Sequence, residues 1–541
     1  MNQTLYNLPQ DILLLVLQYL EAPDVRCLQL TSHACQNTFT DPIYLRTILR
    51  FYTCTREVRA LSTTLPNDES NLYQAFKTIA ARYYHLGRGK ARRLQRLDLR
   101  ALDQSGHWFP APQWDYHESQ PGGRLYHETA GSHLRGMGWK PYLFRPTLWS
   151  YSDGLLVYAP SLVSDSTVHT ADDESNKQAV NEQSGAADSC LIVLDLESGS
   201  VGKVPFDITG KIIRNLRLRE NTLIVEWAEK EPWHDLNMVD KVHRHFASCY
   251  DVTLAQPSTT TSAAAQVSVK FRSEWRVHFL GLPLTSRDYF FSTHTAKHYA
   301  LYYWQPNRSL WTGDEDQPIE ALFVWDISSS SDYRPSDDPT NIHARRTNEK
   351  GHLSGPRCVA RYSMRELEWL GIRQHASISL TRIEIDSANE VLMWRENRFA
   401  NQYGYFDPAE RCWESTSTSF KLVGAGAVLR RTADVELVSY RGHCSMDSTE
   451  VTGGIEGWFL PVCEVGDDQS QVKFGLIETC FTGLVVENRL LARLRLEEDG
   501  EWMNLQDDIV KEVGCMGRIA GDERWLIGQN NKLQLVVARF Q

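Results

Sequence analysis

Short apolar runs bounded by turn residues recur along this 541-residue chain from about residue 149 almost to its C-terminus. Each run has the length of a β-strand and is rich in Val, Ile, Leu, Trp or Tyr, with Gly, Ser, Asp or Asn at its ends. No long helical pattern separates the runs, which disfavours βαβ units and a parallel sheet. The sequence therefore predicts an all-β body. The runs span residues 155–158, 191–196, 223–227, 249–254, 275–280, 299–304, 321–327, 378–385, 391–394, 436–440, 457–460, 484–486 and 533–538.

Several of these runs end beside an aspartate. The segments 191–199, 250–254 and 322–328 each place an Asp next to their last apolar residues. In this they resemble the third strand of a WD-type β-propeller blade, where such an Asp lies near the turn into the outer strand. The Gly-His signature at the proper distance ahead is missing, so any repeats are degenerate. A pair of β-sandwiches remains open as the alternative.

Chain length favours the propeller. Single cores stop growing at roughly 250–300 residues, so 541 residues need more than one compact unit. A blade takes about 40–50 residues. The predicted body, residues 106–541, carries three polar insertions, 164–189, 256–266 and 328–355, which we expect to be mobile loops because they have few apolar residues. The remainder would supply about seven blades.

The N-terminal segment, residues 8–52, has a different pattern that predicts three or four short helices. Pro9 suits a first helical position, and this helix would run to Leu20. A break at 21–23 follows, Asp24 can cap a second helix, a third would end at Phe39, and the Asp-Pro pair at 41–42 starts a fourth. Residues 72–100 are amphipathic and predict one or two connecting helices, within a helical linker spanning 53–105.

The first predicted helix has more apolar surface than one packed side can bury. At about 100° per residue, its apolar side chains cover an arc of about 200°, whereas a helix packed on one side needs a stripe of about 100°. The apolar side of the helix that its neighbours do not bury is either a docking surface or is covered by the C-terminal body. The arc is formed by Ile12, Leu13, Leu15, Val16, Leu17, Tyr19 and Leu20.

The same segment resembles the F-box. The resemblance rests on Leu8-Pro9, on apolar residues at the family's intervals, on the Asp24-Val25 pair and on residues 41–45, with departures at Val25 and at 31–33. It implies an F-box over residues 1–52 that binds a Skp-type adaptor and, through it, the cullin of a ubiquitin ligase. The residues that would contact the adaptor are Leu8, Pro9, Ile12, Val16, Leu17, Leu20, Val25 and Leu28.

Composition narrows the possible partners. The formal net charge of −11 argues against a general nucleic-acid binder, and the basic run at 88–100 is interpreted as a solvated helix face or linker. Eleven cysteines at irregular spacing, with no CxxC, do not form a disulfide framework. The N-terminus lacks a basic, cleavable leader and no apolar run is long enough to cross a bilayer, so we expect a cytoplasmic or nuclear protein.

Catalytic and metal motifs are weak. His234, His243 and His245 form the densest histidine cluster, and the last two would share a strand face, but no carboxylate or Cys stands at ligand spacing. There is no GxSxG elbow and no phosphate loop. The sequence predicts no cofactor, no metal and no enzymatic activity. We therefore expect a substrate-receptor subunit, with a non-ligase scaffold and, less favoured, a propeller-type hydrolase or lyase as the alternatives.

Overall fold

The computed structural model describes part of the chain, and everything below refers to that part. The described residues are 8–63, 69–99, 148–160, 191–235, 241–255, 266–278, 282–283, 289–305, 317–339, 355–369, 371–375, 380–385, 390–400, 406–419, 434–436, 456–466, 472–482, 487–496, 501–514, 518–530, 532 and 534–541. They divide into two compact units. Unit 1 comprises Met1–Leu97, Leu460–Cys480 and Asn488–Gln541, and unit 2 comprises Asp98–Phe459 and Phe481–Glu487.

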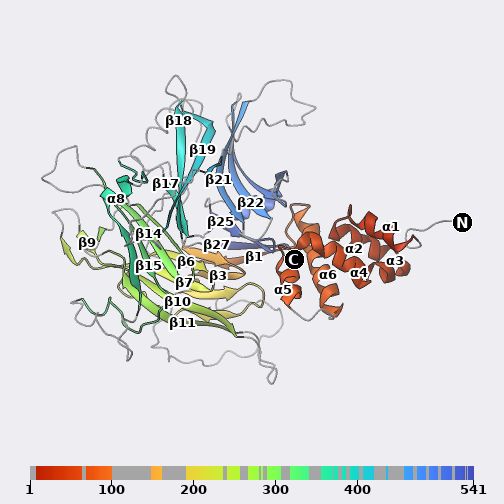
Figure 1. The fold of residues 1–541 in the computed structure, drawn as a ribbon, viewed down its shortest axis with the longest axis horizontal. Helices are drawn as coiled ribbons and strands as arrows, with labels where there is room; N and C mark the ends of the chain where they lie inside the picture. The colour runs from red at the N-terminus through yellow and green to blue at the C-terminus, as the bar shows by residue number, and fades with distance from the viewer. Residues whose placement is uncertain are drawn as a thin grey trace, which may run out of the picture. The chain divides into compact units, whose positions relative to one another are not determined.

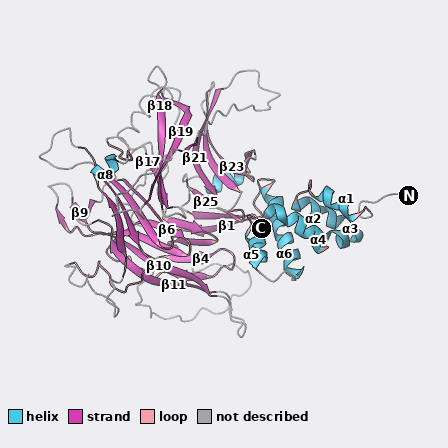
Figure 2. Ribbon diagram, in the orientation of Figure 1, coloured by secondary structure: helices cyan, strands magenta, loops and turns pink. Residues whose placement is uncertain are grey.

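Unit 1 begins with a bundle of short helices, drawn in red and orange in Figure 1 and in cyan in Figure 2. Capping groups fix where they start. The Ser32 hydroxyl accepts a hydrogen bond from the Cys35 N–H, and the Asp41 carboxylate accepts one from the Ile43 N–H. The helices are α1 (Gln10–Leu17), α2 (Ala22–Thr31), α3 (His33–Phe39), α4 (Pro42–Leu49), the 3-10 turn η2 (Arg50–Tyr52), α5 (Arg56–Thr63) and α6 (Glu69–Leu86).

The helix boundaries differ from the sequence prediction at three places. Pro9 is the N-cap of α1, one residue before its first helical position at Gln10. Helix α1 ends at Leu17, and the chain reaches Leu20 through i→i−3 hydrogen bonds, a tighter 3-10-like turn. Helix α2 begins at Ala22, with Glu21 as its N-cap. Asp24 therefore lies inside the first turn and acts from there, because its carboxylate accepts a hydrogen bond from the Glu21 N–H.

One core joins all of these helices. Leu17 and Val25 are fully buried in it together with Phe39, Ile48 and Phe76. The Tyr52 hydroxyl accepts a hydrogen bond from the buried Ala22 N–H, so the start of α2 is satisfied from the 3-10 turn. Since Phe76 belongs to α6, the helices beyond residue 52 are part of the same module.

The rest of unit 1 is mostly β-structure. Strand β1 (Arg93–Asp98) forms the edge of a sheet of order β1-β27-β26-β25, with β25 (Ile519–Gly521), β26 (Trp525–Gln529) and β27 (Gln534–Arg539). Helix α9 (Asp507–Val513) packs on β26 and β27. Residues 93–98 were predicted to be helical and are a strand, because pairing with β27, more than 430 residues away, overrides local preference.

A second four-stranded sheet belongs largely to unit 1. Its order is β21-β22-β23-β24, and it consists of β21 (Glu456–Gly466), β22 (Lys473–Thr482), β23 (Glu487–Arg495) and β24 (Met503–Asn504). Strand β22 contributes the buried Phe474, whose ring stacks on that of Phe540 at a centroid distance of 5.7 Å. This aromatic contact packs β22 against the C-terminal end of the chain.

Unit 2 contains four sheets of four strands. Their orders follow the chain, and the registers that the structure describes are antiparallel. They are formed by β2 (Trp149–Ser152), β3 (Leu155–Tyr158), β4 (Ile192–Asp195) and β5 (Val201–Lys203); by β6 (Lys211–Arg219), β7 (Thr222–Glu229), β10 (His245–Ala255) and β11 (Gln266–Arg276); by β13 (Tyr289–His294), β14 (His298–Gln305), β15 (Ile319–Asp326) and β16 (Arg357–Tyr362); and by β17 (Leu380–Ile385), β18 (Glu390–Ala400), β19 (Phe406–Ser419) and β20 (Asp434–Glu436).

The first strands of these four sheets lie next to one another, β2 against β6, β6 against β13, and β13 against β17. Strands β3 and β13 are buried along their whole length, as expected for sheets covered on both faces. In the described part of the chain no sheet closes on itself. The structure therefore confirms a helical module followed by an all-β body of several sheets.

The aspartates at strand ends have a local role. Asp195 and Asp326 are the last residues of β4 and β15. The Asp326 carboxylate accepts hydrogen bonds from the backbone N–H and the hydroxyl of Ser328, and Asp195 is bonded in the same way by Ser198. Two of the three predicted aspartates are thus turn-forming residues. The third, Asp251, lies inside β10 and pairs with Arg272.

The three predicted insertions fall mainly outside the described residues. Part of the third, residues 328–339, is described and is attached to β11. The Ser331 N–H donates to the Arg272 carbonyl and the Ser336 N–H donates to the Glu274 carboxylate. The Arg334 guanidinium lies 3.8 Å from the centroid of the Phe271 ring. This part of the insertion is a loop, as predicted, and its backbone N–H groups find acceptors on β11.

Candidate docking surface of the helical module

Helix α1 has two different apolar faces. At about 100° per residue, Leu13 and Leu17 point one way, and Ile12, Leu15 and Val16 occupy a separate arc of about 100°. The first pair is buried, with exposed fractions of 2% and 0%. Ile12 and Leu15 are 43% and 53% exposed. The helix therefore packs on one side and presents apolar surface on the other.

The eight residues predicted to contact an adaptor do not all lie on that exposed side. Leu17 and Val25 are fully buried in the core of the module, so their direct role is to hold α1 and α2 in place. Pro9 and Ile12 are exposed. The other four, Leu8, Val16, Leu20 and Leu28, are half-buried. All of them except Val16 pack against the core.

Other exposed apolar side chains of the module were not among the predicted contacts. Leu15, Tyr19 and Leu30 are 53%, 87% and 71% exposed, and Ile43 on α4 is 47% exposed. Leu15 could have been found from its angular position beside Ile12 and Val16. Leu30 had no such signal, because it lies at the end of a short helix whose orientation depends on packing.

Polar contacts hold the helices beneath this surface. The buried Gln29 side chain donates to the Phe39 carbonyl at 2.8 Å and accepts a hydrogen bond from Arg26. Arg26 also donates to the Tyr73 hydroxyl on α6 at 3.1 Å. Burial, with a smaller contribution from Asp41, raises the pKa of Tyr44, which is part of the core. The helices that pack beneath the exposed face of α1 are therefore held together by hydrogen bonds as well as by the apolar core.

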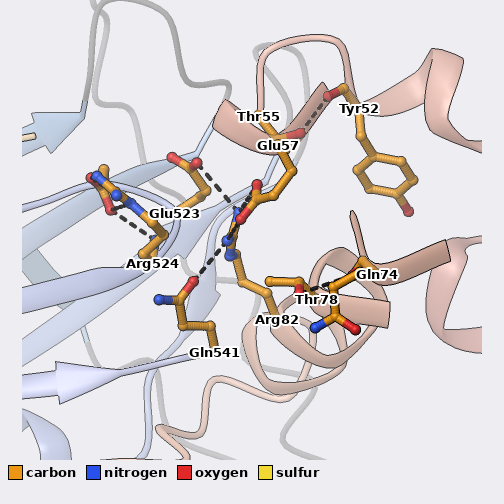
Figure 3. Close-up of polar contacts among 10 residues, drawn as sticks. Tyr52, Thr55, Glu57, Gln74, Thr78, Arg82, Glu523, Arg524 and Gln541 are labelled. Atoms are coloured by element: carbon orange, nitrogen blue, oxygen red, sulfur yellow. Dashed lines mark hydrogen bonds and ion pairs between the residues drawn. The ribbon is translucent and has the colours of Figure 1, made fainter. Parts of the chain in front are cut away.

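A buried arginine connects the module to the C-terminal end of unit 1. Figure 3 shows Arg82 of α6 between Glu57, Glu523 and Gln541. Its guanidinium pairs with both Glu57 oxygens, lies 3.4 Å from Glu523 and donates to the Gln541 side chain at 2.8 Å. The Arg82 side chain is fully buried, and Glu523 retains 6% exposure. Helices α5 and α6 are thus linked to the residues before β26 and after β27.

The histidines of the densest cluster lie in two different sheets. His243 belongs to β9 (Lys241–His243), in a small sheet with β8 (His234–Asp235) and β12 (Leu282–Pro283), whereas His245 begins β10. The expectation that they share a strand face was wrong, because the chain passes from one sheet to another between them. Burial lowers the pKa of both imidazoles, and far more strongly for His245. No group of His, Cys, Asp or Glu suited to a metal ion occurs among the described residues.

The comparisons with known proteins agree with the helical geometry. Residues 5–47 match the F-box domain. This supports an F-box protein and, in general terms, a receptor role in a ubiquitin ligase that binds a Skp1-type adaptor. The match ends within α4, so it contains the exposed face of α1 and the N-caps of α1 to α4.

The β-rich body has only remote similarities. The chain is similar to two structures of Trypanosoma rangeli sialidase, one in complex with 2,3-difluorosialic acid as a covalent intermediate and one with sialic acid, at 8% identity. The TM-scores are 0.31 and 0.29; 83% of this chain is covered, and the chain spans 58% and 59% of theirs. TM-scores this low do not establish the fold of the body. No curated protein matches the sequence. None of the described helices is long and apolar enough to cross a membrane.

Proposed function

We propose that this chain is the substrate-receptor subunit of an SCF-type cullin-RING ubiquitin ligase. The F-box would bind a Skp-type adaptor and, through it, a cullin, and the β-rich body would bind a protein target. The observation that carries the proposal is the exposed apolar face of α1 within a segment that matches the F-box. Ile12 and Leu15 leave apolar surface in water on a helix whose other side is already packed, so burying them on a partner is favourable.

The proposal assigns the chain a binding role. Its contribution is proximity and orientation, while partner subunits carry the ubiquitin chemistry. We place the protein in the cytoplasm, the nucleus or both, where the adaptor and the cullin would be found. The alternative is a scaffold that binds the adaptor without delivering a target.

We further propose that the body is a β-propeller with degenerate blades. Two features support it: six four-stranded sheets follow one another along the described chain, and the first strands of the four sheets in unit 2 adjoin. The described residues contain six such sheets, against the seven blades expected from length.

Adaptor co-purification tests the docking surface. The full chain would carry Ile12→Asp and Leu15→Asp together, two substitutions at exposed positions that leave the core intact. We expect adaptor binding to fall by at least tenfold, because two charges would be placed in an apolar contact. The matched control is Phe51→Asp, since Phe51 is 54% exposed on the same module but lies outside residues 5–47. Full adaptor binding by the double variant would refute the assignment.

Protein half-lives separate the receptor from the scaffold. Cells lacking the protein would be supplied with the wild type or with the Ile12→Asp/Leu15→Asp variant. A receptor predicts a protein whose half-life lengthens in the absence of the wild type and is shortened by the wild type alone. A scaffold predicts that no protein shows this dependence.

A further inference from the structure

An arginine without a side-chain partner and an exposed tryptophan lie on either side of Arg244 in a cluster on unit 2. Arg276 ends β11, directly across the sheet from the fully buried Phe246 of β10. Its guanidinium carbon is 5.9 Å from the centroid of the Phe246 ring. No hydrogen bond or ion pair to the Arg276 side chain occurs in the described part of the chain, and its Nε and Nη2 atoms are buried without a partner. The residue is half-buried, and Nη1 is the guanidinium nitrogen not counted among the buried, unpartnered atoms.

The neighbouring arginine is already neutralised. Arg244 is buried and forms a two-point pair with the Glu229 carboxylate through Nε and Nη2. Its guanidinium carbon lies 5.5 Å from the centroid of the same Phe246 ring and 4.8 Å from that of Trp233. Two cations therefore share one aromatic ring, and only Arg244 has a counter-ion in contact.

The nearest acidic groups are held by other donors. Glu229 is paired with Arg244, and the buried Asp338 accepts a hydrogen bond from the Tyr333 hydroxyl at 3.0 Å. Burial, followed by the charge of Arg244, lowers the pKa of Arg276, while Glu229, Tyr333 and Asp338 act in the opposite direction without contacting it. An unpaired, partly desolvated guanidinium costs free energy, which a bound anion would recover.

Trp233 supplies the apolar part of the site. It is 53% exposed, and its backbone N–H donates to the Val242 carbonyl at 2.7 Å, so the small sheet containing β9 holds it in place. Trp and Arg are the residues that most often dominate binding energy at protein interfaces. An exposed indole against Arg244, which shares the Phe246 ring with the unpaired Arg276, suits a ligand with a negative charge next to an apolar group.

We propose that Arg276 and Trp233 form a binding site for an acidic segment of the target protein, with one Asp or Glu carboxylate on Arg276 and a neighbouring apolar side chain on Trp233. A single carboxylate matches the single uncompensated charge, since Arg244 is committed to Glu229. A phosphate dianion would need a second free cation. This inference deepens the proposed receptor function and rests on it.

Peptide binding to the full chain tests the site. Fluorescence anisotropy at low ionic strength would compare a labelled Glu-Leu-Glu-Leu-Glu peptide with its Gln-Leu-Gln-Leu-Gln counterpart and with inorganic phosphate as a competitor. We expect the Glu peptide to bind at least tenfold more tightly than the Gln peptide, and salt to weaken the difference. Equal binding of both peptides, or displacement of the Glu peptide by phosphate at lower concentrations than by unlabelled peptide, would overturn the proposal.

Four variants locate the site. Arg276→Gln should weaken Glu-peptide binding at least tenfold, Arg276→Lys should restore part of it, and Trp233→Ala, at an exposed position, should weaken it severalfold. The matched control is Arg361→Gln, because Arg361 is an exposed arginine placed 5.4 Å from the Phe323 ring centroid on another sheet. Unchanged binding by both Arg276→Gln and Trp233→Ala would refute the assignment.

The same variants separate this inference from the proposed function. Arg276→Gln should keep adaptor binding, and the Ile12→Asp/Leu15→Asp variant should keep peptide binding. If the peptide site fails while adaptor binding depends on α1, the inference is wrong and the receptor proposal stands. If adaptor binding fails while the peptide still binds, the receptor proposal is wrong.

Discussion

Replacing Arg82 with leucine tests how firmly the F-box helices are held to the C-terminal part of unit 1. In the wild type the fully buried guanidinium satisfies Glu57, Glu523 and the Gln541 side chain at once (Figure 3). Leucine keeps part of the apolar stem and removes every one of these contacts. Glu523, at 6% exposure, is then left as a buried carboxylate without its cation.

The expected loss follows from that unpaired charge. Removing one partner of a buried ion pair typically costs about 3–5 kcal/mol. Because about 1.4 kcal/mol is a factor of ten in an equilibrium constant, local opening of α5 and α6 should become about two to four orders of magnitude more frequent. Hydrogen exchange suits the measurement, since a chain with two compact units does not unfold in one step. The amides of α5, α6, β26 and β27 should lose protection together.

Acidity should reverse part of this loss. Burial, followed by the nearby Asp522, already raises the pKa of Glu523 in the wild type. Burial also raises the pKa of Glu57, but the Arg82 contact outweighs it and the net shift is downward. Without Arg82 we expect both carboxyls to have pKa values above those of the unfolded chain. Their stabilising contribution is then complete below the unfolded pKa and is lost as the pH rises through the folded pKa.

The loss of local stability caused by Arg82→Leu should therefore be largest near pH 7 and become smaller towards pH 5, once the measured exchange is corrected for intrinsic exchange rates. Arg88→Leu is the matched control, because Arg88 is an exposed arginine just beyond the same helix that lies 3.9 Å from the Tyr84 ring centroid. It should change local stability by no more than about 0.5 kcal/mol. A less than tenfold change in opening for Arg82→Leu, or a deficit that does not vary with pH, would show that Arg82 is not the connection described.

Three further outcomes follow from burial and hydrogen bonding. Leu17→Ala, at a fully buried position, should destabilise the helical module by about 2–5 kcal/mol, measured by exchange in α1 to α4, and a loss below 1 kcal/mol would contradict its core position. Glu320→Leu removes the acceptor of the Tyr302 hydroxyl and of the Gln374 and His375 N–H groups, and should raise hydrogen exchange throughout β14 and β15. The control Glu368→Gln, at an exposed carboxylate, should leave that exchange unchanged. Hydrogen bonds from the Ser363 N–H and hydroxyl lower the pKa of Glu366. Its stabilisation of helix α8 (Met364–Trp369) is therefore present above the unfolded pKa and lost as the pH falls through the folded pKa. Hydrogen exchange in α8 should rise on acidification in the wild type and stay flat in Glu366→Gln.

The elements predicted correctly from sequence are those whose causes lie close together in the chain. Ser32 and Asp41 cap the helices that follow them through contacts two or three residues away. Asp195 and Asp326 close turns over the same distance. Short apolar runs bounded by turn residues identified the β-rich body for the same reason, since the length and the flanking turn residues of a strand are visible within a few positions of the sequence.

The elements missed depend on partners far away in the chain. Strand β1 exists through pairing with β27. Residues 328–339 are hydrogen-bonded to β11, which lies 62 residues earlier in the chain at the Ser336–Glu274 contact. The docking face was only partly predicted. The apolar circumference of α1 showed that two faces were needed, but only packing decides that Leu17 lies inside and Leu15 outside. Arg276 gave no signal at all, because being unpaired is a property of its surroundings.

A receptor has to hold its ligase contact and its target contact on a frame that does not bend freely. The exposed face of α1 and the sheet of β25–β27 belong to one compact unit, with Arg82 bonded at the same time to α5 and to both ends of the β26–β27 hairpin. Loss of Arg82 should therefore lower target ubiquitination more than it lowers adaptor affinity, since the core that α6 shares with α1 to α4 remains while the bonds to the β26–β27 hairpin are lost. A fall in adaptor affinity equal to the fall in ubiquitination would show instead that Arg82 acts through the F-box fold.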